Sequence, residues 1–145
     1  MNILKIKTRK RLLGDYGEKQ ARRYLRRHGY RIIKKNFVAD SNEIDIIAES
    51  RDTVAFVEVK TRTVGYENAN EPRPASSVDA KKQRAIINAA RFYIAYNPTS
   101  KKKRFDIIEV YVNRNNGRYS VAEIKHLQNT FSLNTAYAPL ERTGK

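Results

Sequence analysis

Four charged residues interrupt two apolar segments of the chain, and their types and spacing are typical of catalytic chemistry. Glu43 and Asp45 lie within N-E-I-D-I-I-A (42–48), while Glu58 and Lys60 lie within V-A-F-V-E-V-K (54–60). Charges inside strands that should be buried cost free energy unless they are paired or bind a metal. The four residues are therefore the first candidates for a functional site.

The two apolar segments flank a short polar stretch, residues 49–53, and this pattern predicts an antiparallel hairpin. Side chains alternate along a strand, so Glu58 and Lys60 share one face and Glu43 and Asp45 share one face. With the turn near Ser50–Asp52, Asp45 lies opposite residue 57 or 58. The Cβ atoms of Asp45 and Glu58 are then expected to lie within about 5 Å of each other.

Two carboxylates that close repel each other unless a cation lies between them. A structural interpretation is a partly buried ion-pair network of Asp45, Glu58 and Lys60. The other, which we favour, is a divalent cation, and hard oxygen ligands with room for water suit Mg²⁺ or Mn²⁺. Such an ion would polarise a phosphodiester and acidify a bound water. Lys60 would orient or deprotonate that water, or stabilise the developing charge.

Composition points to a polyanionic partner. The 145-residue chain carries 30 Lys and Arg against 15 Asp and Glu, a formal charge of +15, and this excess indicates nucleic acid. There is no cysteine, which excludes disulfides and thiolate metal sites. The chain has no apolar run of membrane-spanning length, and its N-terminus lacks the apolar core of a secretion signal. A cytoplasmic protein without membrane contact is expected.

Hydrophobic periodicity predicts an α/β fold with a central mixed sheet of five strands flanked by helices. The helices are expected over Arg9–His28 and Val78–Tyr96, and the strands over Tyr30–Ala39, Glu43–Ala48, Val54–Lys60, Phe105–Val112 and Tyr119–Lys125. The second helix supplies a crossover, so the third and fourth strands can be parallel. A single domain, 1–131, is expected to begin with a basic arm, 1–8, and to be followed by a disordered tail, 132–145.

Finer features of the chain are also predicted. Ser76 or Ser77 should cap the second helix, after a loop of about a dozen residues that has the length of a lid. Residues 101–104 (K-K-K-R) should form a solvated loop, and 126–131 a short helical turn. Gly14 and Gly17 weaken the first helix, so both are expected to permit close backbone approach.

Two further charged residues have two interpretations each. Glu18 lies beside the small-residue edge of the first helix, where it either reaches a site or forms an exposed pair with Arg22 at i+4, and spacing alone favours the exposed pair. Lys82 falls on the apolar stripe of the second helix. It either extends its ammonium to water or points at an acidic cluster on the sheet.

Five short segments in order give the chain a family resemblance. They are G-x-x-G-E-x-x-A (14–21), x-E-I-D-I-I-A (42–48), F-V-E-V-K-T-R (56–62), V-x-x-x-K-Q (78–83) and R-F-D-I-I (104–108). With them the chain resembles the PD-(D/E)xK superfamily of restriction-endonuclease-like nucleases, and more closely the bacterial YraN-type family of endonuclease-like proteins. Asn42 stands where that family usually has glycine.

The resemblance implies a restriction-endonuclease-like sandwich and a Mg²⁺- or Mn²⁺-dependent endonuclease acting on DNA, including branched, Holliday-junction-like DNA. Asp45 and Glu58 match the metal-binding acids, Lys60 the catalytic lysine, and Glu18 an additional acid of the metal shell. Lys82 and Gln83 match auxiliary polar positions, and with Arg62 they are expected to contact nucleic acid. A homodimer is expected by analogy with branch-cutting relatives. The alternatives are a nucleic-acid-binding protein that keeps the nuclease fold without catalysis, and a structural or ribosome-associated adaptor that needs no metal site.

Overall fold

A computed structural model describes residues 8–65 and 78–133 of the chain. The helices are α1 (Arg9–Arg27) and α2 (Ala80–Tyr96), and the strands are β1 (Arg31–Ala39), β2 (Asn42–Glu49), β3 (Thr53–Thr63), β4 (Lys102–Asn115) and β5 (Arg118–Phe131). Most of the predicted basic arm, the loop at 66–77 with Ser76 and Ser77, and the tail from 134 lie outside the described residues. No helix in the described ranges combines the length and apolar character needed to cross a membrane.

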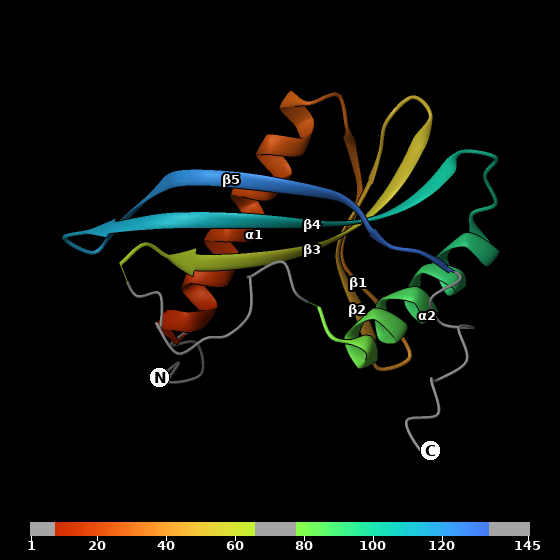
Figure 1. Cartoon of the computed structure of the whole chain (residues 1–145), viewed down its shortest axis with the longest axis horizontal. Helices are drawn as coiled ribbons and strands as arrows, with labels where there is room; N and C mark the ends of the chain where they lie inside the picture. Colours follow the sequence, from red (N-terminus) through yellow and green to blue (C-terminus); the bar gives the residue numbers. More distant parts are fainter. Residues whose placement is uncertain (1–7, 66–77, 134–145) are drawn as a thin grey trace, which may run out of the picture.

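The strands form one mixed sheet in the order β1-β2-β3-β4-β5, which confirms the predicted α/β class and agrees with a restriction-endonuclease-like fold. β3 and β4 are parallel, joined by the crossover that contains α2, and every other neighbouring pair is antiparallel. Figure 1 shows that β1 and β2 run steeply across the direction of β3, β4 and β5. The sheet is therefore strongly twisted, as sheets of L-residues are.

The two helices cover opposite faces of the sheet because alternate residues of β3 point to opposite sides. Val54 and Phe56 pack in the core under α2, whereas Ala55 and Val57 pack in the core under α1. From α1, Ala21 and Leu25 are fully buried in that second core, and the helix spacing of four residues aligns them on one face. By the same alternation, Glu58 lies on the α2 face.

Close packing of α1 on β3 depends on a glycine. A Cβ at Gly17 would lie only 1.9 Å from Oγ1 of Thr61, so only glycine permits this approach. The predicted need for Gly17 is confirmed. The same prediction for Gly14 is wrong, since a Cβ there would meet no described residue within 4 Å.

Three local predictions are corrected by the structure. Lys102 begins β4 and pairs with Thr53, so residues 101–104 are not a free loop. Residues 126–131 extend β5, where Leu127 pairs with Ile107, because strand pairing outweighs the local helical pattern. The cap of α2 is Asp79, whose carboxylate accepts the Lys82 N–H at 2.8 Å.

Candidate functional site

The candidate site lies where β2 and β3 diverge. Their paired positions run from Glu49↔Val54 to Ile46↔Val57, a register that confirms the predicted hairpin and would place Asp45 opposite Glu58. The backbone pairing of β2 with β3 ends at Ile46, and the next contact between the two strands is made by the side chain of Asp45. Its Oδ2 accepts the backbone N–H of Val59 at 2.8 Å. The carboxylate thus bridges the two separating strands and is held against β3.

Glu58 is a buried carboxylate with incomplete partners. Glu58 is 7% exposed, and its Oε2 atom is buried with no hydrogen-bond donor among the described residues. The other oxygen, Oε1, lies 3.9 Å from Nζ of Lys60 and 3.8 Å from Nζ of Lys82. These separations exceed hydrogen-bond length. Lys82 therefore points at the sheet's acidic residues, the second of its two interpretations, yet neither lysine fully neutralises Glu58.

The pKa values of Glu58 and Asp45 are raised by burial, which the lysine charges offset only in part. Burial, and next the charge of nearby Asp45, raise the pKa of Glu58 to about 7, because Lys82 and Lys60 oppose the rise only in part. Burial also raises the pKa of Asp45, against the lowering by the Val59 hydrogen bond and by Lys82. Each carboxyl group thus has an environment that disfavours its charged form. Such perturbed acids cluster at functional sites.

Glu18 reaches the same region from α1 through a hydrogen bond with Asn36, a residue that was not predicted from the sequence. With its amide nitrogen turned toward the acids, Asn36 of β1 donates to Oε2 of Glu18 at 3.3 Å and to Oε1 of Glu43 at 3.2 Å. Burial, then the charge of Asp45, raise the pKa of Glu18 to about 7. Glu18 is therefore near the acidic residues of β2, and the charge of Arg22 also acts on it and lowers its pKa.

The remaining predicted residues lie around this centre. Lys60 and Arg62 are half-buried on β3, and Gln83 donates its side-chain amide to the carbonyl of Val78 at 2.8 Å. Within residues 8–65 and 78–133, no three His, Cys, Asp or Glu side chains converge closely enough to form a metal cage. The structure thus brings together Asp45 and Glu58, with Lys60 and Lys82 beside Glu58, and leaves Glu18 at the edge.

A second buried charge, Asp106 on β4, belongs to a separate network. Arg104 donates to both of its oxygens, from Nε to Oδ1 at 2.9 Å and from Nη2 to Oδ2 at 2.8 Å. Nε2 of His126 lies 2.7 Å from Oδ2, and the backbone N–H of Asn129 donates to Oδ1 at 3.0 Å. Tyr30 hydrogen-bonds Arg104 in turn. Because every oxygen of Asp106 has partners, this network is structural; the only sequence signal for it was an acid inside an apolar strand.

Known proteins resemble this chain over most of its length. A family described as "Uncharacterised protein family UPF0102" matches residues 17–110. A UPF0102 protein of Caldanaerobacter subterraneus is 41% identical over 126 residues, covering 86% of this chain and 98% of that protein. A UPF0102 protein of Clostridium acetobutylicum is 39% identical over 124 residues, covering 83% and 93%. One from Chlorobium phaeobacteroides is 44% identical over 102 residues, covering 70% and 77%.

Proposed function

The chain belongs to the UPF0102 family, and we propose that its Asp45–Glu58–Lys60 site makes it a Mg²⁺- or Mn²⁺-dependent phosphodiesterase acting on DNA. One observation carries the proposal: two buried carboxyl groups, Asp45 and Glu58, lie within hydrogen-bond reach of each other, and Oε2 of Glu58 has no hydrogen-bond donor among the described residues. A purely structural site would place the two lysines at hydrogen-bond distance. Here they stop at 3.8 and 3.9 Å.

The donor set fits a hard divalent cation of the magnesium type. Mg²⁺ keeps several waters and binds through one or two carboxylates together with substrate phosphates, so it does not need a cage of three protein acids. Asp45 and Glu58 would supply the carboxylates, and Glu18 is proposed as a third acid at the edge. When bound, the ion would polarise a phosphodiester oxygen and lower the pKa of a water.

The other residues act on the substrate and on water. Lys60 shares the β3 face with Glu58, and its ammonium orients the attacking water or stabilises the charge that develops on the phosphoryl oxygens; only its neutral amine could take the proton of that water. Lys82, 3.8 Å from Oε1 of Glu58, lies on α2 across the same site. With Arg62 and Gln83, it is proposed to hold the phosphate backbone near the reacting bond.

Cleavage assays test this activity directly. Labelled linear, flapped and four-way DNA are incubated with the whole protein and Mn²⁺, and Asp45→Asn, Glu58→Gln and Lys60→Gln are each expected to cut about 100-fold more slowly or worse. Glu123→Gln on exposed β5 is the matched control and should cut like the natural chain. Absence of cleavage on every substrate, or equal cleavage by Asp45→Asn, contradicts the proposal.

A second candidate function is nucleic-acid binding without catalysis. It is favoured by the net charge of +15 and by the lack of a three-acid metal cage in the described part of the chain. Calorimetric titration with Mn²⁺ at pH 8 separates the two. Catalysis requires heat of binding that Glu58→Gln abolishes, whereas the binding protein would show no metal uptake and an affinity for DNA that falls steeply with salt.

A further inference from the structure

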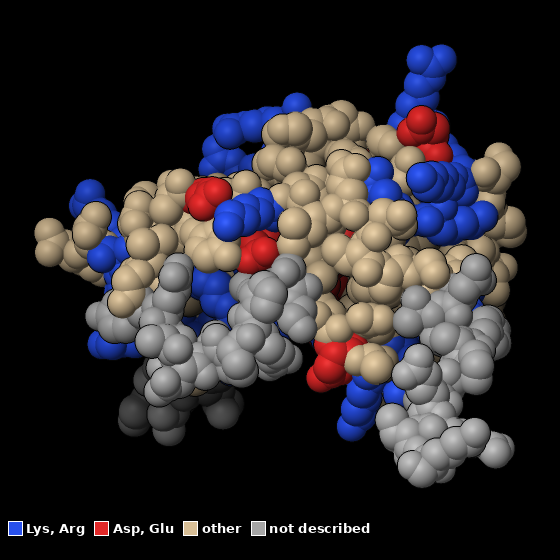
Figure 2. All heavy atoms as spheres, in the orientation of Figure 1, with Lys and Arg blue, Asp and Glu red and all other residues tan. Residues whose placement is uncertain are grey.

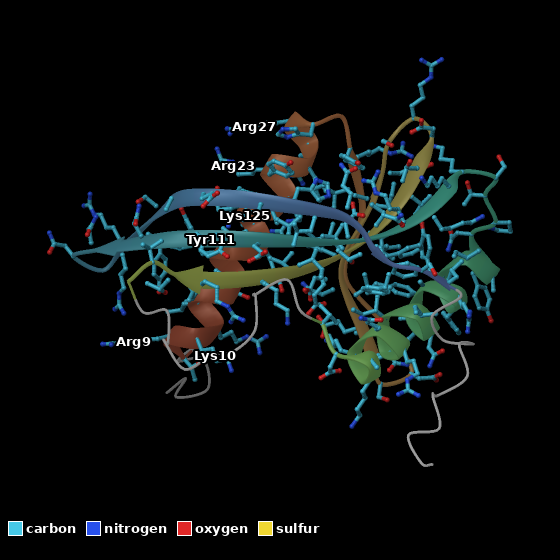
Figure 3. The ribbon with its side chains drawn as sticks, viewed as in Figure 1. Arg9, Lys10, Arg23, Arg27, Tyr111 and Lys125 are labelled. Carbon is cyan, nitrogen blue, oxygen red and sulfur yellow. The ribbon has the colours of Figure 1, made fainter. Side chains whose placement is uncertain are left out.

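A basic groove lies between α1 and β1, outside the acidic site. It encloses about 690 Å³. We call it the α1–β1 groove, and its lining residues are Lys19, Arg22, Arg23, Arg26, Ile32, Ile33, Lys34 and Lys35. Six of the eight are cations and none is acidic. Figure 2 shows Lys and Arg atoms gathered over the C-terminal end of α1, where Figure 3 labels Arg23 and Arg27.

The helix presents its cations as a stripe. Lys19, Arg22, Arg23 and Arg26 are spaced by three and four residues, so they share one side of α1. No ion pair within the described ranges involves any of the six groove cations; Arg22 acts on Glu18 only at longer range, by lowering its pKa. A concentration of uncompensated charge in a concave site favours a polyanion.

The groove begins beside Glu18, at the edge of the acidic site. Lys19 directly follows Glu18, and Lys35 directly precedes Asn36, the residue whose amide donates to Glu18. From that contact the groove runs along α1 toward Arg26 and along β1 toward Ile32. From Lys19 to Arg26 the helix rises about 10 Å. One strand of B-DNA places about three phosphates in that length, at 3.4 Å of axis per phosphate.

We propose that the α1–β1 groove binds the phosphodiester backbone of DNA next to the position where the acidic site acts, an assignment that rests on the proposed function. The cationic groove leads to Glu18, the acid at the edge of the proposed metal site. A different explanation is that lysines on an edge strand prevent the addition of a further strand. It applies to Lys34 and Lys35, because β1 is an edge strand. It does not account for the four cations that α1 places opposite them. A flat membrane surface would fit a convex patch better than a groove.

Binding measurements without metal test the proposal. A fluorescent 20-base-pair duplex is titrated in EDTA at several salt concentrations with the whole protein, with Arg23→Gln/Arg26→Gln and with Lys34→Gln/Lys35→Gln. Each double variant removes one wall of the groove, and Gln keeps the helix propensity of Arg. Each is expected to weaken binding about tenfold at moderate salt and to lower the slope of log affinity against log salt by about 1 to 2.

The matched control removes the same charge elsewhere. Arg114→Gln/Arg118→Gln lies at the exposed β4–β5 turn, away from α1 in Figure 1, and should change affinity less than twofold. A wild-type salt slope in both groove variants overturns the proposal, as does an equal loss in the control. Because EDTA removes any metal, a failure of cleavage or of Mn²⁺ uptake leaves this result readable. Conversely, if the natural chain cleaves DNA but both groove variants bind DNA as it does, only the assignment of the groove is overturned.

Discussion

The backbone N–H of Val59, the residue that follows Glu58 on β3, donates to Oδ2 of Asp45 at 2.8 Å. This contact closes the gap that opens where β2 leaves β3, and it holds Asp45 beside Glu58. Asp45 therefore has a structural task in addition to its proposed role as a metal ligand. The two tasks can be separated because an amide still accepts a hydrogen bond, whereas a methyl group does not.

Two substitutions at Asp45 should have different effects on stability but the same effect on metal binding. Asp45→Asn keeps an acceptor for the Val59 N–H, while Asp45→Ala leaves that donor unpaired, which costs about 1 to 3 kcal/mol of unfolding free energy. Urea denaturation in EDTA should therefore rank Asp45→Asn well above Asp45→Ala. Both variants should lose Mn²⁺ binding by calorimetry. Equal stability of the two would show that the hydrogen bond contributes nothing.

The raised pKa of Glu58 predicts a pH-dependent stability. Its folded value of about 7 lies above the unfolded 4.5, so the folded state gains stability from the protonated group below pH 4.5 and loses it as the pH rises through 7. Without metal, Glu58→Gln should match the natural chain at low pH and exceed it by about 2 to 3 kcal/mol at pH 8. Denaturation across pH measures this. Mn²⁺ at pH 8 should stabilise only the natural chain, and a constant difference between the two proteins over pH 4–8 would contradict the assignment.

Two glycines on α1 should respond in opposite ways to alanine. Gly17→Ala would place a Cβ 1.9 Å from Oγ1 of Thr61, and the overpacking should destabilise the protein by about 1 to 3 kcal/mol. Gly14→Ala meets no described residue within 4 Å and should stabilise the helix by up to about 1 kcal/mol. Thermal unfolding compares them. Adding Thr61→Gly to Gly17→Ala should restore much of the loss; no restoration would place the clash elsewhere.

The Asp106 network predicts acid sensitivity of the fold. Burial alone would raise the pKa of Asp106, but the hydrogen bonds from His126, Arg104 and the Asn129 backbone outweigh it and hold the pKa below its usual 3.8. This group therefore adds stability above pH 3.8 that is lost as the pH falls through its lower, folded value. Asp106→Asn, which strands the Arg104 charge, should cost about 3 to 5 kcal/mol at pH 7. The difference from the natural chain should shrink in acid, and a difference independent of pH would contradict the network's ionic character.

Local pattern was sufficient for much of this protein. Alternation along two strands and the length of their turn determined that Asp45 and Glu58 are neighbours, because both are properties of adjacent residues. The five-stranded α/β sheet and its parallel pair followed from the order of periodic segments. Where local pattern and strand pairing disagreed, as at 126–131, the pairing partner was more than a dozen residues away and local pattern failed.

The neutralisation of the acidic charges, and the residues that surround them, depend on packing between segments that are distant in the sequence. The approach of Lys82 to Glu58, the Oε2 atom without a donor among the described residues, the Asn36 contact with Glu18 and the α1–β1 groove all depend on how a helix packs on strands far away in sequence. Sequence spacing assigns side chains to faces but carries no distances between elements. Packing supplies those distances, and here it set both the protonation of the two acids and the position of the cations beside them.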